Sequence, residues 1–214
     1  LTSDGEVIVM HDSNAYRTTG VDENIVNMTY KEVRRLDAGS WYSDEYKGEK
    51  VPGLREVLEL AQGKIKLNIE LKPADNGEEL ARKTVALIEK YNMENDCVIT
   101  SFSSSALLSA KSCDENIRVG YILSAAYGDY YDMKNIDFFS VNAAYLSKRT
   151  IDAIHNSGKQ VYAWTVNNKD SIKNLTNKGV DGVITDNPVL ARETIYSRDT
   201  SETIVNMIRY VFNQ

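Results

Sequence analysis

The sequence predicts an α/β protein built as a (β/α)8 barrel, and three observations lead to this fold class. Short apolar, β-branched runs recur along the chain, and segments with helical periodicity separate them. Most of these runs lack strict polar alternation, which is typical of parallel strands buried on both faces. The strand–helix–strand units repeat roughly every 20–30 residues, which implies parallel strands joined by right-handed crossovers.

A doubly wound open sheet would also explain these repeats, but the strand ends favour the barrel. Polar residues follow many different strands: His11, Glu70, Lys72, Ser101, Asn142, Thr165 and Asp186. A barrel gathers all of its strand ends around one opening, whereas an open sheet spreads them along an edge. No glycine-rich phosphate loop of the G-x-G-x-x-G or G-x-x-x-x-G-K-[ST] type follows any strand, so nucleotide-binding open sheets lose support.

The individual elements are predicted from their patterns and end signals. Strands are expected at 7–10, 66–71, 97–100, 119–123, 138–141, 161–166 and 182–185. Helices are expected after the Thr29-x-x-Glu32 capping box, over 54–61, from Asn76 to Tyr91, after Ser147, after Asn168 and from Pro188. Seven strands fall short of eight, and no strand precedes the turn at 3–5. We therefore expect the first strand or two of the barrel to lie upstream of Leu1.

Length and composition narrow the organisation. A chain of 214 residues suffices for one sizeable core or at most two small domains. We expect one barrel domain over 1–196, with its N-terminal part absent from this sequence, and a helix over 197–214 packed on the barrel. The alternative for that last segment, a membrane-surface helix, is disfavoured because Arg209 is its one basic residue after Arg198.

Charge and residue usage exclude several classes of protein. There are 31 acidic and 25 basic residues, a net charge of −6, which argues against a general nucleic-acid binder. No stretch approaches the roughly 20 apolar residues of a membrane-spanning helix. Two cysteines make neither a disulfide framework nor a zinc site.

Few residues are candidates for chemistry. Of the two histidines, His11 follows the strand expected at 7–10 and could donate or accept a proton near neutral pH, whereas His155 is interpreted as an outer helix residue. Glu70 and Lys72 lie two apart in a strand and so share a face. They either form a structural ion pair, or Glu70 binds a hard cation and Lys72 a phosphate. Trp164, taken alone, is either a core residue or a substrate wall.

Seven short motifs stand out along the chain. They are His11-Asp12 with Arg17-Thr-Thr-Gly20, Leu36-Asp-Ala-Gly-Ser-Trp41, Val51-Pro-Gly-Leu54, Asn68-Ile-Glu-Leu-Lys72, Thr100-Ser-Phe102, Ala163-Trp-Thr-Val-Asn167 and Gly182-Val-Ile-Thr-Asp-Asn-Pro188. In this order they resemble the glycerophosphodiester phosphodiesterase family, and the resemblance runs from Leu1 to about Ala191. Single motifs of this length are weak signals, but seven in the family's order are a strong one.

The resemblance implies a (β/α)8 barrel and metal-dependent hydrolysis of glycerophosphodiesters to glycerol 3-phosphate and an alcohol. His11 resembles the second of the family's two catalytic histidines, a general acid or base. Glu70 resembles an acidic ligand for Ca²⁺ or Mg²⁺, and Lys72 resembles the lysine that neutralises phosphate charge. Trp164 and Phe102 resemble walls of the site around the glycerol moiety.

The sequence departs from the family's pattern at its start. The opening His-Arg-Gly and the Glu-x-Asp pair of metal ligands are absent, and we expect both immediately upstream of Leu1. These 214 residues therefore hold one of two catalytic histidines and one of three acidic ligands, and by themselves we expect them to be inactive.

Two other functions stay open at this point. One is a related barrel phosphodiesterase such as a phosphatidylinositol-specific phospholipase C, and the other is a non-catalytic module that binds phosphate esters. The segments 36–51 and 64–73 also resemble family members with a membrane domain ahead of the catalytic domain. That likeness implies membrane anchoring or an extracytoplasmic location of the complete protein, through a part not present here. The oligomeric state is left open.

Overall fold

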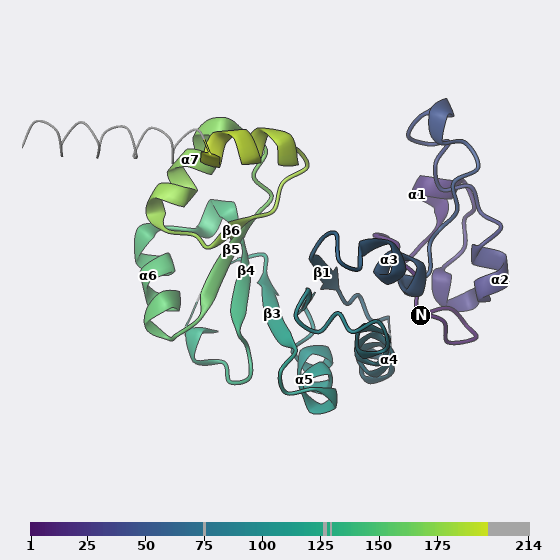
Figure 1. Ribbon diagram of the computed structural model, residues 1–214, viewed down its shortest axis with the longest axis horizontal. Helices are drawn as coiled ribbons and strands as arrows, with labels where there is room; N and C mark the ends of the chain where they lie inside the picture. The colour runs from purple at the N-terminus through teal and green to yellow at the C-terminus, as the bar shows by residue number, and fades with distance from the viewer. Residues whose placement is uncertain (75, 126–127, 129, 197–214) are drawn as a thin grey trace, which may run out of the picture. The chain divides into compact units, whose positions relative to one another are not determined.

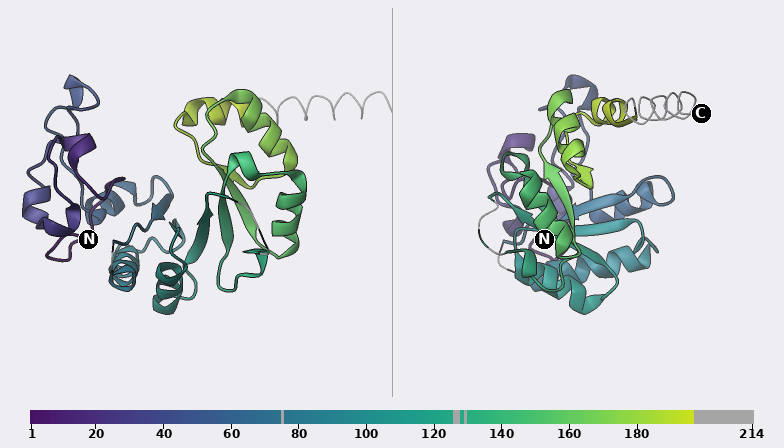
Figure 2. Two further views of the ribbon diagram at one scale, coloured as in Figure 1. Left: turned by 180° about the vertical axis from the view of Figure 1, so that it is seen from behind. Right: turned by 90° about the vertical axis from the view of Figure 1, so that its left-hand side faces the viewer.

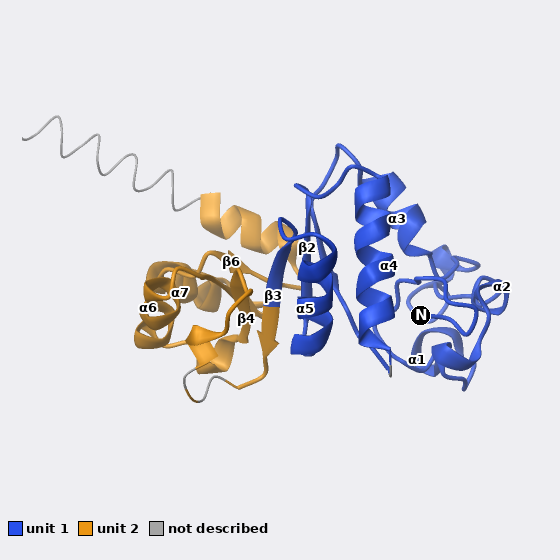
Figure 3. Ribbon diagram, turned by 90° about the horizontal axis from the view of Figure 1, so that it is seen from below, with its two compact units in different colours: residues 1–120 blue, residues 121–214 orange. Residues whose placement is uncertain are grey.

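A computed structural model of the chain describes residues 1–74, 76–125, 128 and 130–196. It divides into two compact units, Leu1–Gly120 and Tyr121–Gln214, which Figure 3 colours blue and orange. Strand β3 (Arg118–Leu123) begins in the first unit and ends in the second. The helix expected over 197–214 lies outside the described residues, and the expectation of one barrel domain over 1–196 stays a prediction.

Six strands occur among the described residues, and each lies within two residues of a predicted one (Figure 1). They are β1 (Leu67–Glu70), β2 (Cys97–Ser101), β3 (Arg118–Leu123), β4 (Phe138–Asn142), β5 (Gln160–Trp164) and β6 (Gly182–Val183). Pairing is parallel in both units: β1 with β2 in the first, and β4 with β5 and β5 with β6 in the second. Parallel neighbours in chain order are what the predicted βα repeats require.

The strand predicted at 7–10 is wrong. This run is extended, but it forms only an isolated antiparallel bridge, between Ile8 and Gly53. A longer ladder is blocked on the partner side, because Pro52 has no N–H to donate and helix α3 (Leu54–Ala61) begins directly after the bridge. The preceding turn is confirmed by a backbone hydrogen bond of 2.9 Å from the amide of Gly5 to the carbonyl of Thr2.

Helices fill most of the intervals between the strands. They are α1 (Tyr16–Thr19), α2 (Tyr30–Val33), α3 (Leu54–Ala61), α4 (Gly77–Lys90), α5 (Ser104–Cys113), α6 (Lys148–Asn156) and α7 (Lys169–Lys178). Single 3-10 turns occur at η1 (Ile25–Asn27), η2 (Asp44–Tyr46), η3 (Tyr130–Asp132) and η4 (Ala143–Tyr145). A further helix begins at Pro188, as predicted, and includes residues 188–196.

The predicted helix starts are confirmed by their caps. Thr29 and Glu32 form a complete capping box on α2, and the side chains of Asn76, Ser147 and Asn168 each accept an amide hydrogen bond at the start of their helix. Helix α5 was not predicted. Its buried side is formed by Ala106, Leu107 and Ala110. Two alanines and one leucine give a weak periodic signal, although Ser103 caps the helix.

Each unit packs its helices on its own strands. In the first unit, α4 lies against α3 and α5, and α5 lies against β2 (Figure 2). In the second unit, α6 lies against β5, and the fully buried side chains include Phe138, Phe139, Ile151, Ile154 and Ile172. These contacts bury the apolar helix faces that the sequence pattern marks.

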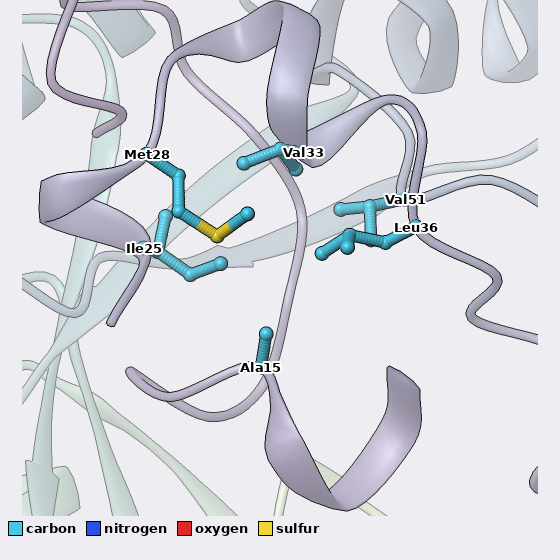
Figure 4. Close-up of a cluster of buried hydrophobic side chains, with 6 residues drawn as sticks. All are labelled: Ala15, Ile25, Met28, Val33, Leu36 and Val51. Atoms are coloured by element: carbon cyan, nitrogen blue, oxygen red, sulfur yellow. The ribbon is translucent and has the colours of Figure 1, made fainter. Parts of the chain in front are cut away.

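An apolar cluster of buried side chains lies in the N-terminal part of the first unit (Figure 4). Its buried members are Ala15, Ile25, Met28, Val33, Leu36 and Val51. Three partly buried residues pack against it, namely Ile8, Met10 and Ala38. Because Met10 precedes His11 and Ala38 follows Asp37, this cluster anchors the starts of two polar segments described below.

The capping box on α2 provides a test of the energetics of this region. Thr29→Ala removes the oxygen that accepts from the amide of Glu32, and we expect the free energy of unfolding to fall by about 1 kcal/mol. Urea denaturation followed by circular dichroism measures this change. Thr29→Ser keeps the hydroxyl and serves as the control; an equal loss in both variants would mean that the cap does not stabilise the helix.

Candidate active site

One cavity in the first unit gathers three of the five predicted site residues. It has a volume of about 660 Å³, and His11, Glu70 and Lys72 all line it. His11 follows the bridged segment at 7–10, whereas the other two come from the carboxyl end of β1 and the residues just after it. Most of the remaining wall is apolar, and its other polar members are Asp12, Ser13, Asn68 and Thr84.

Strand alternation places Glu70 and Lys72 on the same face, as predicted. Leu71 between them is buried, and the Lys72 Nζ atom lies 3.7 Å from Oε2 of Glu70. The ion pair that the sequence left as one alternative is therefore present. The two side chains are 31% (Glu70) and 38% (Lys72) exposed, and a pair this solvated contributes little to stability. Both groups thus stay available to a ligand.

Hydrogen bonds to β2 fix the segment that carries Lys72. The amide of Leu71 donates to the carbonyl of Thr100 at 2.7 Å, which extends the pairing of β1 and β2 by one residue. The hydroxyl of Ser101 donates to the carbonyl of Leu71 at 2.8 Å. Ser101, one of the polar strand-end residues, is buried and serves to hold this neighbouring segment.

His11 has a carboxylate partner that was not singled out from the sequence as a site residue. Its Nδ1 atom lies 2.7 Å from Oδ1 of Asp12, and Nε of Arg17 donates to Oδ2 of the same carboxylate at 2.5 Å. The hydrogen bond from Arg17, followed by that from His11, lowers the pKa of Asp12 to about 2. The adjacent His-Asp pair was the available signal, but spacing alone does not show that Arg17 joins it.

The described residues do not form a complete metal site. No group of three or more His, Cys, Asp or Glu side chains within 1–74, 76–125, 128 and 130–196 lies close enough together to hold a metal ion. Two carboxylates line the cavity among the described residues, those of Asp12 and Glu70. The Asp12 carboxylate is already engaged by Arg17. The residues described therefore do not fit a bound cation unaided.

Neither of the two predicted wall residues is among the described residues that line this cavity. Phe102 directly follows β2 and is 50% exposed, and it is not among the described residues that line the cavity. Trp164 ends β5 in the second unit, where its Nε1–H donates to the carbonyl of Ser140 at 2.9 Å. Their predicted contact with a substrate stays a prediction.

Polar strand ends in the second unit form a network of their own. The Asn167 side chain donates to Oδ2 of Asp186 at 2.6 Å and accepts from the backbone amide of Asp186 at 2.9 Å. His155 on α6 instead contacts Oδ2 of Asp181 at 2.9 Å. This contact agrees with the interpretation of His155 as a helix residue outside the site.

The motif at 36–41 begins a loop that closes on one carboxylate. Asp37 accepts hydrogen bonds from the amides of Gly39, Ser40 and Gly48 and from the Ser40 hydroxyl. These bonds hold the pKa of Asp37 well below its usual range. The loop carries Trp41, whose ring is 52% exposed and whose Nε1–H donates to the carbonyl of Ala38.

Solved structures show the fold class. The chain superimposes with a TM-score of 0.87 on a phosphodiesterase from Oleispira antarctica, solved in complex with its product sn-glycerol-3-phosphate, at 30% identity over 91% of this chain and 81% of that one. A glycerophosphodiester phosphodiesterase from Agrobacterium tumefaciens matches with a TM-score of 0.74 at 25% identity, over 89% and 82% of the two chains. The predicted (β/α)8-barrel class is confirmed. The prediction that the chain is a phosphoric diester hydrolase is confirmed as well.

Sequence comparison shows the family. Residues 1–190 match the glycerophosphoryl diester phosphodiesterase family, and the chain belongs to it. A glycerophosphodiester phosphodiesterase of Caldanaerobacter subterraneus subsp. tengcongensis is 29% identical over 219 aligned residues, which cover 98% of this chain and 83% of the relative. No helix in the described part of the chain is long and apolar enough to cross a membrane.

The loop closed by Asp37 provides a second test. Asp37→Ala removes the acceptor of three backbone amides, and we expect hydrogen exchange at 39–48 to accelerate. Because the folded pKa lies below the usual value of 3.8, the protection is complete above about pH 4 and falls as the pH drops below it. Hydrogen exchange with mass spectrometry measures both effects. Asp44→Ala, an exposed carboxylate of the same loop, is the control; equal acceleration there would contradict the assignment.

Proposed function

We propose that this protein hydrolyses glycerophosphodiesters to glycerol 3-phosphate and an alcohol, with His11 as a general acid or base. The observation that carries the proposal is the cavity that brings His11, Glu70 and Lys72 together in a chain that belongs to this family. The product found in the Oleispira antarctica relative supports glycerol 3-phosphate as the product here.

The contacts of His11 suit a proton-transfer role. Its Nδ1 atom faces the Asp12 carboxylate, which leaves Nε2 as the nitrogen that can exchange a proton with a substrate oxygen. A histidine with one nitrogen held by a carboxylate and the other directed at the reacting group is the arrangement of a general base. In this proposal His11 either activates the nucleophile or protonates the leaving alkoxide.

Lys72 would supply charge complementarity to the phosphoryl group. A diester phosphate carries one negative charge and gains more on its oxygens in the transition state, so a nearby ammonium lowers the barrier. The ammonium of Lys72 is paired with Glu70 at 3.7 Å, too long for a hydrogen bond, and it can turn toward an anion without breaking one. We assign Trp164 and Phe102 as walls around the glycerol moiety on the family likeness.

A divalent cation, Ca²⁺ or Mg²⁺, is part of the proposal through Glu70. Carboxylate oxygens are the preferred ligands of both ions. Since Glu70 offers one carboxylate, further ligands are required to complete such a site, and the role of Glu70 as a metal ligand is supported by the family likeness and by its place beside the cavity.

Replacing His11 tests the catalytic assignment. We expect His11→Gln to lower kcat by about 10²- to 10⁴-fold, the contribution of a general acid or base, with a small change in KM. Glycerophosphocholine turnover, read out as glycerol 3-phosphate release, measures this. His155→Gln is the matched control and should retain wild-type kcat. These assays use the complete protein, including the residues expected upstream of Leu1. Full activity of His11→Gln would remove His11 from the mechanism, and a complete wild-type protein without turnover would favour a binding module.

Replacing Glu70 tests the cation. We expect Glu70→Gln to shift the metal dependence of turnover to at least about tenfold higher Ca²⁺ or Mg²⁺, because the affinity of such sites depends on ligand charge. Activity is titrated with each metal after dialysis against a chelator. Glu78→Gln on helix α4 removes an exposed carboxylate outside the cavity and is the control. An unchanged metal titration in Glu70→Gln would show that Glu70 is not a ligand.

A further inference from the structure

A chain of side-chain contacts leads from the exposed ring of Trp41 to His11. Arg17 holds the centre of this chain. Its guanidinium donates from Nε to Oδ2 of Asp12 at 2.5 Å and from Nη2 to Oδ1 at 3.3 Å, a two-pronged contact with one carboxylate. Oδ1 of that carboxylate also lies 2.7 Å from Nδ1 of His11. Arg17 and Asp12 thus form a two-pronged ion pair, and one oxygen of its carboxylate also faces the imidazole.

The guanidinium of Arg17 also contacts Trp41. The guanidinium carbon lies 5.1 Å from the centre of the indole ring, within the range of a cation–π contact. Trp41 is itself fixed, because its Nε1–H donates to the carbonyl of Ala38 at 2.9 Å. The loop closed by Asp37 therefore holds the Trp41 ring in contact with Arg17.

We propose that Asp12 and Arg17 are positioning residues that hold His11 in its Nδ1–H tautomer with Nε2 directed at the substrate, and that Trp41 braces Arg17. The assignment rests on the proposed function for its catalytic consequence, but the tautomer can be observed without catalysis. Neither Asp12 nor Arg17 nor Trp41 needs to contact the substrate for this role.

The exposure of His11 explains why such a device is needed. Its side chain is 74% exposed, so packing restricts the ring little. A neutral, solvated imidazole favours the Nε2–H tautomer, which presents no free lone pair at Nε2. An ionised carboxylate at Nδ1 reverses this preference, because it accepts from Nδ1–H. The pKa of Asp12, lowered by Arg17 and His11, keeps that carboxylate ionised throughout the neutral range.

A direct role of Arg17 in binding phosphate is the competing explanation. Arginine is a common phosphate ligand, and its planar fork would suit a diester. In this structure two of its N–H groups are engaged by Asp12, and its guanidinium carbon lies over the ring of Trp41. The geometry therefore favours positioning, and the two roles separate in kinetics: a lost ligand raises KM, whereas a misplaced base lowers kcat.

The first experiment reads the tautomer. Long-range ¹H–¹⁵N correlation spectra of the imidazole rings are recorded at pH 8, above the unperturbed histidine pKa of about 6.5, and the His11 signals are assigned by their loss in His11→Gln. We expect Nδ1–H to predominate in the wild type and Nε2–H in Asp12→Ala, with Arg17→Ala intermediate. Asp170→Ala, an exposed carboxylate on α7, should leave the spectrum unchanged. A wild-type His11 in the Nε2–H form would overturn the proposal.

The second experiment reads catalysis in the same variants. We expect Asp12→Ala to lower kcat about 10- to 100-fold, by analogy with carboxylates that orient metal-binding histidines, with KM nearly unchanged. Trp41→Ala should lower kcat about two- to fivefold, in line with an exposed cation–π contact. Tyr46→Ala, an exposed aromatic residue of the same loop whose ring contacts Tyr42, is the matched control.

The outcomes are distinguishable from failure of the proposed function. If the wild type holds the Nδ1–H tautomer but does not hydrolyse glycerophosphodiesters, the positioning of His11 stands and the substrate assignment falls. If Arg17→Lys raises KM at constant kcat while the tautomer is retained, Arg17 is a phosphate ligand and the positioning role is overturned. Thermal unfolding of each variant shows whether a loss reflects a folding defect.

Discussion

The parallel pairing of β1 with β2 is the constraint on which the candidate site depends. The register places Glu70 opposite Thr100, and the next residue of each chain continues the contact through the amide of Leu71 and the hydroxyl of Ser101. Because a strand alternates its side chains, fixing Leu71 in the buried layer turns both of its charged neighbours to the other face. A slip of one residue would bury Glu70 and Lys72, at the large cost of desolvating two charges.

Two aspartates organise the N-terminal part of the first unit in different ways. Asp37 accepts mainly from backbone amides and so determines the course of a loop, whereas Asp12 accepts from two side chains and so determines their orientation. Both carboxylates keep a lowered pKa because hydrogen bonds stabilise their charged form. The apolar cluster around Val33 supports both segments through Met10 and Ala38. The hydrogen bonds of Asp12 and Asp37 are therefore held in place by an apolar cluster formed from the same part of the chain.

The contacts of Glu70 and Lys72 reconcile the two interpretations that their spacing allowed. An ion pair on a partly solvated surface is weak, and weak pairs exchange partners readily. In the proposed function, the same two groups neutralise each other without ligand, and we expect them to turn to a phosphate or a cation when one binds. A pair buried deeply enough to stabilise the fold would have been a poor ligand set, because separating it would leave a charge without a partner.

Local chemistry in the sequence determined the elements, and tertiary contacts decided how the site residues meet. Six of the seven strand runs, capping side chains such as Thr29 and Asn76, and the shared face of Glu70 and Lys72 were predicted correctly. They follow from short-range periodicity and hydrogen bonding. Helix α5 escaped prediction because alanines on its buried side give little periodic contrast, and the run at 7–10 failed to become a strand because its partner is a proline followed by a helix start. The order from Trp41 through Arg17 to the imidazole could not be read from spacing. Contacts between residues far apart in the chain depend on how loops close and pack. Local patterns of residue types along the chain do not show which distant side chains will meet.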